Sequence, residues 1–517
     1  MSTTRRPLAR RTAATACALV LAAVGLTGCA TERLGGGGGS DDACAALAET
    51  YGSFPEGTTV TIATPFSGEE ATAFDASLEA FAECTGITVV QEGSDTLEQG
   101  LRDALPSPTA PATGTAAPSL AAQTATPTPS GDGETAAATE AGAEAPTSSH
   151  ADLAVVPQPG LIAELARAGL VAQMPEAVAA NIELGWEHVW AEAGTVDGTL
   201  YAAPLMASVK SFVWYSPAAF DKAGYEVPTS WEELVSLTQR IAADHPEGDV
   251  VPWCLGASDG PNTGWPLSDW LEDALLATEG TAAYDAWAHH GVPLDDRRAV
   301  AALSALDRLL LTDGHVAGGG QGAVTTTVEE VGEQLVSGSC LMLHASSSFE
   351  TLLPQGTVVT DGEDTQAQGV STFLLPSIDD GEDAVLVGGD YLVDLVARPQ
   401  DGEDGDSAGA EASTSEAEVA VMSYLTSAQW AAERVSMGGV ASANRGARDV
   451  EGSSPVAQAA SDILQSRQSV IRFDASDTMP SQVGTRALWD ALVAWAKGDT
   501  DAARALRQAE EAWPSGR

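Results

Sequence analysis

The chain has 517 residues, and 24 Lys and Arg against 73 Asp and Glu give it a formal net charge of −49 at pH 7. Because so acidic a protein repels phosphate groups, a nucleic acid ligand is excluded. The hydrophobic fraction of 44% is ordinary for a globular protein and excludes disorder throughout the chain. Aromatic residues make up only 5%, but the 12 Trp outnumber both Tyr and Phe, so the aromatic surface is concentrated in the side chain with the largest flat face.

The N-terminal segment has the features of a secretion signal that ends in a lipid attachment site. Four arginines between positions 5 and 11 precede an apolar run over residues 13–26, and Leu26-Thr-Gly-Cys29 follows. This order resembles the lipobox of bacterial lipoproteins. A transmembrane anchor is the alternative, but the run is shorter than the about 20 residues that span a bilayer. We expect residues 1–28 to be a lipoprotein signal peptide and Cys29 to hold the protein, by lipid, on the extracellular face of the cell membrane.

Three stretches contain too few large apolar side chains to form a core. Residues 30–43 include a run of glycines, and with Cys29 they are expected to form a flexible tether. Residues 106–149 are mainly Ala, Thr, Pro, Ser, Gly and Glu, and residues 400–418 are acidic and rich in Ser, Ala and Gly. Such compositions cannot bury enough apolar surface to become ordered, so we expect two disordered insertions in a folded body.

Hydrophobic periodicity predicts alternating strands and helices in the rest of the chain. Residues 58–63 and 87–90 read as strands, and Phe74, Leu78 and Phe81 share one face of a helix between them. This βαβ unit predicts a parallel first sheet. The further predicted elements are strand 151–156, helix 161–170, strand 211–215, a helix opened by the capping box Ser230-Trp-Glu-Glu233, helices 265–277, 296–312 and 328–337, strands 340–344 and 385–397, and helices 416–437 and 486–497. Their number exceeds one compact domain.

The cysteines indicate an oxidising compartment. Removal of the signal and lipidation of Cys29 leave Cys44, Cys84, Cys254 and Cys340, an even number that permits three connectivities. Because each pair lies within one segment of the chain, we favour bridges 44–84 and 254–340. A zinc site is the alternative, but no CxxC or HxxxH spacing supports it, and we expect no metal and no cofactor.

One sequence pattern suggests catalysis. Gly256-Ala-Ser-Asp-Gly260 matches the nucleophile elbow of serine hydrolases, and His344 lies downstream. The elbow needs a helix directly after the serine, whereas Pro261-Asn-Thr-Gly264 continues the turn, so we interpret the pattern as a loop. Gly318-Gly-Gly-Gln-Gly322 lacks the Lys-Ser/Thr of a P-loop and is interpreted in the same way.

A tryptophan-rich segment is more informative. Trp253, Trp265, Trp270 and Trp287 lie within 35 residues, and polar residues are interleaved with them: Asp259, Asn262, Thr263, Asp269 and Asp273. A sugar has a face of C–H groups and a rim of hydroxyls, so its site needs a flat aromatic ring beside carboxylates and amides. The alternative is core packing. We expect about two of the four Trp to lie in the core and one or two to face a ligand.

The order of several short motifs resembles that of family 1 extracellular solute-binding proteins of ABC importers. The general motifs are Trp214-Tyr-Ser-Pro217, Gly224-Tyr-Glu-Val-Pro228 and Trp231-Glu-Glu-Leu234. Others are similar to the narrower alpha-glucoside branch: Pro252-Trp-Cys-Leu-Gly256, Gly264-Trp-Pro266, Asp269-Trp-Leu-Glu-Asp273, Cys340-Leu-Met-Leu-His344, Gly388-Gly-Asp390 and Phe473-Asp-Ala-Ser-Asp-Thr-Met-Pro480. The resemblance covers residues 45–510 apart from the two insertions.

The resemblance implies a two-lobed α/β fold of the periplasmic-binding-protein type, each lobe a mostly parallel sheet flanked by helices and joined to the other by hinge strands. Residues 45–157 with 384–440 would form the N-terminal lobe, and 158–383 with 441–510 the C-terminal lobe. The implied function is non-catalytic: a monomer that binds an alpha-glucoside or related oligosaccharide by hinge closure and delivers it to the transmembrane subunits of an ABC permease. A secreted lipoprotein hydrolase acting on a glycan or ester, and a non-binding envelope scaffold, are the alternatives.

The resemblance also implies a ligand-binding set. The N-terminal wall would be Phe66, Glu69, Ser94, Asp95 and Gln158, and the facing lobe and hinge would supply Trp265, Phe349, Asp390, Asp474 and Asp477. The chain departs from the family where Ala345-Ser-Ser-Ser-Phe349 replaces the usual Arg-Gln-Ala-Ser-Phe, which removes a charged and an amide side chain near the cleft. The long insertion at 106–149 is a second departure and has no bearing on the ligand.

Overall fold

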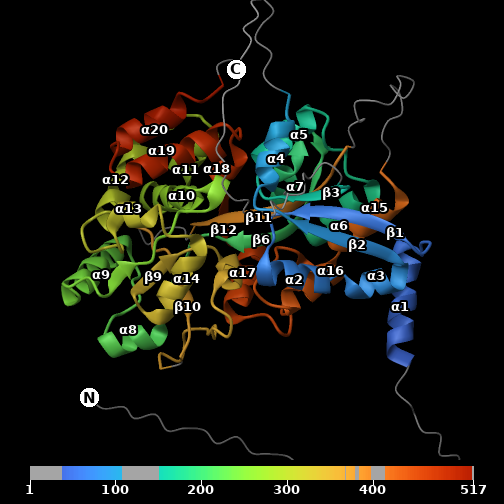
Figure 1. Ribbon diagram of the computed structural model, residues 1–517, viewed down its shortest axis with the longest axis horizontal. Helices are drawn as coiled ribbons and strands as arrows, with labels where there is room; N and C mark the ends of the chain where they lie inside the picture. The colour runs from blue at the N-terminus through green and yellow to red at the C-terminus, as the bar shows by residue number, and fades with distance from the viewer. Residues whose placement is uncertain (1–37, 107–150, 367, 379–383, 397–413, 515–517) are drawn as a thin grey trace, which may run out of the picture. The chain divides into compact units, whose positions relative to one another are not determined.

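The computed structural model describes residues 38–106, 151–366, 368–378, 384–396 and 414–514 (Figure 1). The expected signal peptide, Cys29, residues 30–37 of the tether, and residues 107–149 and 400–413 of the two expected insertions lie outside these residues. The described ends of these stretches are ordered, contrary to expectation: residues 38–43 belong to the helix Gly38–Tyr51, and residues 416–418 begin the helix Glu416–Leu425, which Ser415 caps. Contacts between Cα atoms divide the chain into residues 1–43 and residues 44–517. Both sheets, both disulfides and the cavity belong to the second unit.

The first sheet is mixed. Its strands are β1 Thr58–Thr64, β2 Ile87–Gly93, β3 Leu153–Val156, β6 Ala202–Val209, β11 Ala384–Asp394 and β12 Val470–Phe473. The order is β12-β11-β3-β1-β2, and β6 also pairs with β11. β1 is parallel to β2 and to β3, as the βαβ pattern predicts, whereas the long strand β11 is antiparallel to β3 and β6.

The second sheet has the order β10-β7-β9-β8. Its strands are β7 Phe212–Tyr215, β8 Val251–Trp253, β9 Cys340–His344 and β10 Ser371–Leu374; β4 Thr195–Val196 and β5 Thr199–Leu200 form a separate hairpin. β8 and β9 are parallel, but β7 is antiparallel to both its neighbours. The two-lobed α/β fold is therefore confirmed, although the second sheet is less parallel than expected. β7 leads the chain into this lobe and β10 leads it back towards β11, so the two run in opposite directions.

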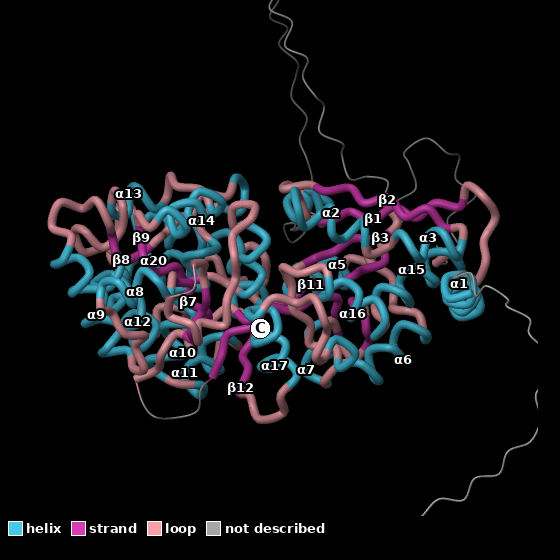
Figure 2. The backbone as a smooth tube through the Cα atoms, turned by 90° about the horizontal axis from the view of Figure 1, so that it is seen from below, coloured by secondary structure: helices cyan, strands magenta, loops and turns pink. Residues whose placement is uncertain are grey.

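Helices flank both sheets (Figures 1 and 2). Around the first sheet lie α1 Gly38–Tyr51, α2 Gly68–Ala76, α3 Glu79–Thr85, α4 Leu97–Ala104, α5 Pro159–Arg167, α6 Glu176–Gly185, α7 His188–Ala193, α15 Glu416–Leu425, α16 Ala428–Ser436 and α17 Pro455–Gln465. In the second lobe lie α8 Pro217–Ala223, α9 Trp231–Asp244, α10 Trp265–Glu279, α11 Thr281–Ala288, α12 Arg297–Leu310, α13 Gly319–Ala323, α14 Val328–Ser337, α18 Ala475–Thr478, α19 Trp489–Ala496 and α20 Ala502–Glu510. The 3₁₀ helices are η1 Gly260–Asn262, η2 Ser347–Leu352 and η3 Arg445–Ala447, and η4 Val483–Leu488 is a π-helix. None of the helices in the described part of the chain is both long enough and apolar enough to span a bilayer.

The chain passes between the lobes at the ends of three neighbouring strands. β6 continues into β7 through Lys210 and Ser211, β10 precedes β11, and β12 continues into α18 through Asp474. The Lys210 amide donates to the Leu386 carbonyl at 2.7 Å, and the Asp474 amide donates to the Val387 carbonyl at 2.9 Å. We refer to residues 209–212 as the first crossing segment and to residues 473–475 as the last crossing segment; both are hydrogen-bonded to the start of β11.

These crossings correct the expected lobe boundaries. Residues 158–209 and 441–473, which we expected in the C-terminal lobe, supply α5, α6, α7, β6, η3, α17 and β12 to the first lobe. Trp186 and Trp190 are buried in the same core as β1 and β2. The chain thus changes lobe where β6 and β12 end, because β6 and β12 both pair with β11.

Both disulfides join the expected cysteines. Cys44 of α1 is bonded to Cys84 of α3, with Cα atoms 5.0 Å apart. Cys254, which follows β8, is bonded to Cys340 of β9, with Cα atoms 5.2 Å apart. Each bridge therefore lies within one lobe.

Candidate ligand-binding site

A cavity of about 940 Å³ lies between the two lobes. It reaches the upper range of ordinary small-molecule sites, so an oligosaccharide-sized ligand would fit. Its polar and aromatic lining includes Phe66, Glu70, Ser94, Asp95, Glu98 and Gln158 from the first lobe, Asp259, Asn262, Trp265, Ser268, Asp269, Glu329 and Trp489 from the second, and Lys210, Ser476 and Asp477 at and beside the crossing segments.

Trp265 presents an indole to this cavity. It is the first residue of α10 and follows Gly264, whose φ of 112° places it in a backbone region that favours glycine. A Cβ on Gly264 would also meet Trp489 Cβ at 2.9 Å. The indole Nε1 donates to Asp259 Oδ2 at 2.8 Å. The loop before α10 and this hydrogen bond therefore hold the orientation of the ring.

The other three tryptophans of this segment lie in the core. Trp253, Trp270 and Trp287 are each at most 1% exposed, whereas Trp265 is partly exposed. Three of the four thus pack, one more than expected, and Trp265 alone of the four lines the cavity.

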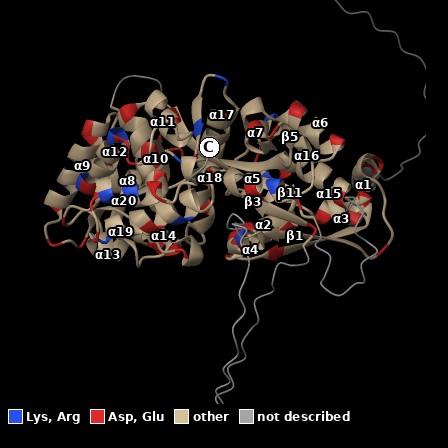
Figure 3. Ribbon diagram, turned by 90° about the horizontal axis from the view of Figure 1, so that it is seen from above, with Lys and Arg blue, Asp and Glu red and all other residues tan. Residues whose placement is uncertain are grey.

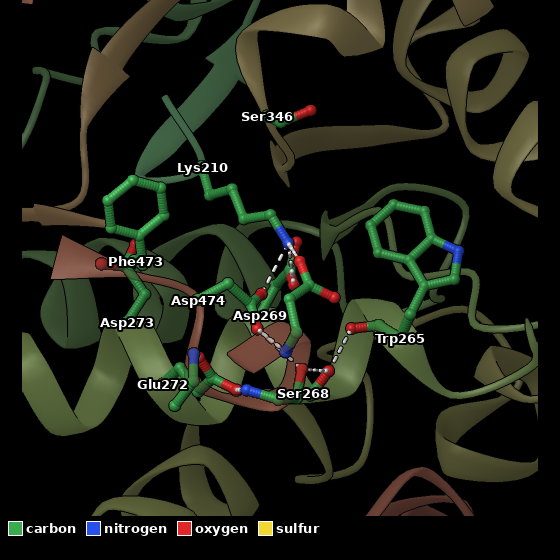
Figure 4. Close-up of polar contacts among 12 residues, drawn as sticks. Lys210, Trp265, Ser268, Asp269, Glu272, Asp273, Ser346, Phe473 and Asp474 are labelled. Atoms are coloured by element: carbon green, nitrogen blue, oxygen red, sulfur yellow. Dashed lines mark hydrogen bonds and ion pairs between the residues drawn. The ribbon is translucent and has the colours of Figure 1, made fainter. Parts of the chain in front are cut away.

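A buried cluster of charged side chains lies beside the cavity, between the two crossing segments (Figure 4). Lys210 Nζ lies 3.1 Å from Asp269 Oδ1, 2.5 Å from Asp474 Oδ2 and 3.4 Å from Asp477 Oδ2. The Asp474 side chain is 1% exposed and those of Lys210 and Asp477 about 15%. Asp474 also caps α18, since its Oδ1 accepts from the Asp477 amide at 3.0 Å. One ammonium therefore holds three carboxylates from two segments of the chain.

The pKa values of this cluster differ in direction. Burial lowers the pKa of Lys210, but the surrounding carboxylates outweigh it and raise this pKa well above its usual value. Burial acts to raise the pKa of Asp474, but Lys210 lowers it to about 2. Burial and the neighbouring Asp474 raise the pKa of Asp477 to about 7, against the attraction of Lys210. Asp474 is thus the permanent anion of the cluster, and Asp477 titrates near neutral pH.

Helix α10 is bonded to both crossing segments through two further acids. Glu272 accepts from the amides of Ala475 and Ser476 at 2.5 and 2.9 Å. Asp273 accepts from Ser211 Oγ at 2.7 Å and lies 2.9 Å from His344 Nε2. Because α10 begins at Trp265, one rigid element connects the aromatic wall of the cavity to the points where the chain changes lobe.

His344, the candidate catalytic histidine of the sequence pattern, belongs to this network. Its imidazole is bonded to Asp273 and stacks on Trp270, with ring centroids 4.3 Å apart. Ser258 is instead followed by η1, and α10 begins seven residues after it. The strand, serine and immediate helix of a nucleophile elbow are therefore not formed.

The first lobe supplies hydrogen-bond acceptors. Gln158 is 6% exposed, and its Oε1 has no hydrogen-bond partner among the described residues. Glu98 is 4% exposed, and burial raises its pKa, although Arg102 opposes the shift. Asn262 Nδ2 of the second lobe donates to Glu98 Oε2 at 3.4 Å, so a polar contact connects the two lobes across the cavity.

The ten expected ligand-binding residues do not all reach this cavity. Those that line it are Phe66, Ser94, Asp95, Gln158, Trp265 and Asp477. Asp474 lies in the charged cluster. Asp390 lines a smaller cavity of about 190 Å³ that shares Phe66, and Glu69 lines another of about 220 Å³. Phe349 is 4% exposed and packs against Trp214, with ring centroids 6.3 Å apart.

The segment that contains the departure from the family motif lies beside one of the smaller cavities. Ser348 lines the cavity of Asp390, where burial and the neighbouring Glu70 raise the pKa of Asp390 to about 8. The other two serines make internal bonds, since the Ser346 carbonyl accepts from Trp214 Nε1 and Ser347 Oγ accepts from the Val209 amide. Ser348 stands where the family also has Ser. The positions of the replaced charged and amide side chains are Ala345, which is buried, and Ser346, and neither residue lines the large cavity or the two smaller ones.

Several lining residues were not in the expected set. They include Glu70, Glu98, Lys210, Asp259, Asn262, Ser268, Asp269, Glu329, Ser476 and Trp489. Lys210 had a detectable signal, because it is the only charged residue between Asp197 and Asp221. Within the described residues, no group of three or more His, Cys, Asp or Glu side chains is arranged to hold a metal ion. Acidic side chains are spread over both lobes (Figure 3).

Comparison with known proteins agrees with this architecture. Residues 124–431 match the family model of the bacterial extracellular solute-binding protein. The chain is 30% identical over 459 residues to the osmoprotective compounds-binding protein GgtB of Synechocystis sp., covering 88% of this chain and 92% of that one. It is 29% identical over 473 residues to the alpha-glucosides-binding periplasmic protein AglE of Rhizobium meliloti, covering 89% and 88%.

A solved structure has the same fold. A chitin oligosaccharide binding protein superposes with a TM-score of 0.63 at 15% identity, over 88% of this chain and 97% of the other. Together with the family match, this likeness in fold accounts for the two lobes and the cavity between them. The chain belongs to the family of bacterial extracellular solute-binding proteins of ABC importers, which bind their solute without catalysis.

Proposed function

We propose that this protein is a lipid-anchored binding protein of an ABC importer, and that it takes up an alpha-glucoside or related oligosaccharide in the cavity between its lobes. The observation that carries the proposal is the pairing of Trp265 with acceptor groups. The indole ring of Trp265 lines the cavity, and Asp477, Gln158 and Glu98 line the same cavity. A saccharide would stack its C–H face on the indole and donate its hydroxyls to these oxygens.

The names of the relatives support this ligand class. AglE is named for alpha-glucosides and GgtB for osmoprotective compounds. Both names describe those proteins. They suggest which ligands to test with this protein, namely alpha-glucosides of increasing length and small polyhydroxylated compounds.

Delivery would follow from movement at the crossing segments. A ligand that touches both lobes stabilises the arrangement in which they lie close together, and the permease would recognise that closed form. The connection of α10 to Ser211 and Ala475 gives the second lobe a rigid path from the ligand to these segments. The protein is expected to act as a monomer.

A ligand panel tests the binding function. A form that begins at residue 30, and so keeps the Cys44–Cys84 disulfide, would be purified and its melting temperature measured with mono-, di- and trisaccharides and polyols. A ligand present at about 100 times its Kd adds about 2.7 kcal/mol to the free energy of unfolding, so binding raises the melting temperature measurably. No shift with any saccharide or polyol would contradict the proposal and favour a non-binding envelope scaffold.

The anchor is tested separately. The Cys29→Ala variant should remain unprocessed or be released from the membrane, because the thiol is the proposed acylation site. Membrane fractionation and mass measurement of the N-terminal peptide follow both effects. A Cys29→Ala protein that is still processed and still sediments with membranes would contradict lipidation at this position.

A further inference from the structure

Lys210 is the only basic residue among the described side chains that line the cavity. An ammonium has three donors, and here three carboxylates surround it at 2.5 to 3.4 Å. No donor is left for a ligand. The carboxylates that it holds are different, because Asp269 and Asp477 themselves line the cavity.

The surroundings of Lys210 connect this cluster to the passage between the lobes. Its amide is bonded to Leu386, and its aliphatic stem passes the backbone of β11 at Gly388, where a Cβ would lie 2.7 Å from Lys210 Cε. Its shortest partner, Asp474, belongs to the last crossing segment. The ammonium therefore joins the first crossing segment, the last crossing segment and α10 at one point.

We propose that Lys210 is the positioning residue of the ligand site: it holds Asp269 and Asp477 at the cavity wall as acceptors for ligand hydroxyls and ties them, through Asp474, to both crossing segments. This inference rests on the proposed saccharide site. It adds a residue that acts on the ligand only through its carboxylate partners, and it makes affinity depend on a charge that the ligand does not touch.

The chemistry of the acceptors explains why a cation is needed. An ionised carboxylate accepts hydrogen bonds more strongly than a protonated one, but neighbouring buried carboxylates raise one another's pKa. The titratable groups around Asp477 are Lys210 of the first crossing segment, Asp474 of the last, Asp269 and Glu272 on α10, Glu98 on α4 and Asp390 on β11. Further titratable groups lie on the other adjoining elements. Glu164 of α5 is bonded to Ser481, Tyr284 of α11 is bonded to Glu272, and Arg486 of η4 lies near Arg102. Lys210 is the cation that lowers the pKa of Asp477.

Affinity should therefore depend on pH near neutrality. With a pKa of about 7 in the free protein, Asp477 is mostly protonated at pH 6 and mostly ionised at pH 8. A ligand that binds only the ionised form gains about tenfold in affinity between these values, because the ionised fraction of a group with this pKa rises about tenfold from pH 6 to pH 8. The Asp477→Asn variant, whose side chain is at the cavity surface, should bind with little dependence on pH.

Three variants of Lys210 separate positioning from stability. Lys210→Met should weaken binding by at least about tenfold at pH 8 and less at pH 6, because Asp477 then remains protonated at the higher pH. Lys210→Arg keeps the charge and should restore the rise between pH 6 and pH 8. If Lys210→Met does not fold, the double variant Lys210→Met/Asp474→Asn carries the test, since it removes one charge of each sign from the buried site.

The measurement is titration calorimetry at pH 6, 7 and 8 with the saccharide that shifts the wild-type melting temperature most. A folded Lys210→Met variant that keeps the wild-type affinity and pH profile would overturn the inference while leaving the proposed function intact. In the double variant the losses of Lys210 and Asp474 shift the pKa of Asp477 in opposite directions, so its affinity alone is compared, and an affinity equal to the wild type would likewise overturn the inference. A double variant that fails to fold would also count against it, because Lys210 would then be required by the core. A wild-type protein that binds no saccharide would refute the proposed function itself.

Discussion

Trp265 Nε1 donates to Asp259 Oδ2 at 2.8 Å, and both residues line the cavity between the lobes. Asp259 precedes η1, and Trp265 begins α10, so a hydrogen bond between the two ends of one short loop sets the angle of the indole. Burial raises the pKa of Asp259, and the bond from Trp265 opposes that rise. The ring orientation thus depends on a carboxylate that sequence reasoning assigned only to the polar background of the tryptophans.

The Asp259→Ala variant should weaken saccharide binding by about 1 kcal/mol, because the indole loses its partner and one acceptor leaves the cavity. Its melting temperature without ligand should stay near that of the wild type, since Asp259 is partly exposed. Titration calorimetry measures the affinity. Glu279→Ala is the matched control, because Glu279 is an exposed acid at the far end of the same helix. Equal affinities in the two variants would show that the Asp259 contact is not used.

Asp474→Ala should reduce stability and not only ligand affinity. We expected Asp474 at the cleft surface, but it is 1% exposed, pairs with Lys210 and caps α18. The variant removes the carboxylate at 2.5 Å from the buried ammonium together with the cap of α18, while Asp269 and Asp477 still face Lys210, so the cost should be near the lower end of the about 3–5 kcal/mol of a broken buried pair. Urea denaturation without ligand would measure the loss. A free energy of unfolding within 1 kcal/mol of the wild type, on the scale of an exposed pair, would be inconsistent with this cluster.

The free energy of unfolding should fall as pH rises from about 4 to 8. Asp477 and Asp390 have pKa values of about 7 and about 8 in the folded protein, raised mainly by burial. An unfolded Asp titrates near 3.9, so between these pH values the folded state binds more protons than the unfolded state, and stability decreases with pH. Asp474, whose pKa is lowered to about 2, acts oppositely: its contribution is present above pH 4 and is lost as pH falls towards 2.

Melting temperatures of the ligand-free protein from pH 3 to pH 8 test this balance, with the maximum expected near pH 4 to 5. Asp390→Asn should flatten the decline towards pH 8, because the amide does not ionise. A wild-type protein that is more stable at pH 8 than at pH 5 would contradict the assigned protonation states.

Loss of the Cys254–Cys340 bridge should cost more than loss of the Cys44–Cys84 bridge. Each is expected to contribute about 2–4 kcal/mol by restricting the unfolded chain. The sequence separations are 86 and 40 residues, and the longer loop adds roughly 0.7 kcal/mol on chain-entropy grounds. Urea unfolding of the two paired Cys→Ala variants compares them. Recovery of a Cys84–Cys254 peptide from the wild type would overturn the pairing within each lobe.

The sequence predicted elements where local signals dominate. The helix after Ser230 begins as expected: Ser230 Oγ accepts from the Glu233 amide at 3.2 Å, and Glu233 Oε2 accepts from the Thr229 amide at 2.8 Å. The expected helix 416–437 is divided into α15 and α16, because Ser427 caps a new helix by accepting from the Trp430 amide. Hydrophobic periodicity continues across such a break, whereas the cap is a property of a single residue.

Long-range pairing limited the prediction of lobes and site. β6 and β12 lie next to β11 although they are separated from it by more than 70 residues in the sequence, and no local pattern indicates that pairing. Lys210 is visible in the sequence as an isolated charge, but its pairing is not, since its three Asp partners are brought to it by α10, the last crossing segment and α18. Trp265 was identified because an aromatic ring among polar residues is visible within one segment.

The most direct test of the saccharide site is titration calorimetry of the wild type and Trp265→Ala with the best ligand of the panel. The wild type should bind with saturable heat, and Trp265→Ala should bind more weakly by about 1–3 kcal/mol, as expected for a lost aromatic anchor. Trp231→Ala is the control: Trp231 is the first residue of α9 and packs in the core of the second lobe, so its loss should lower the melting temperature and leave the affinity of the folded protein unchanged. A Trp265→Ala protein that binds as tightly as the wild type would contradict the assignment of the cavity as the saccharide site.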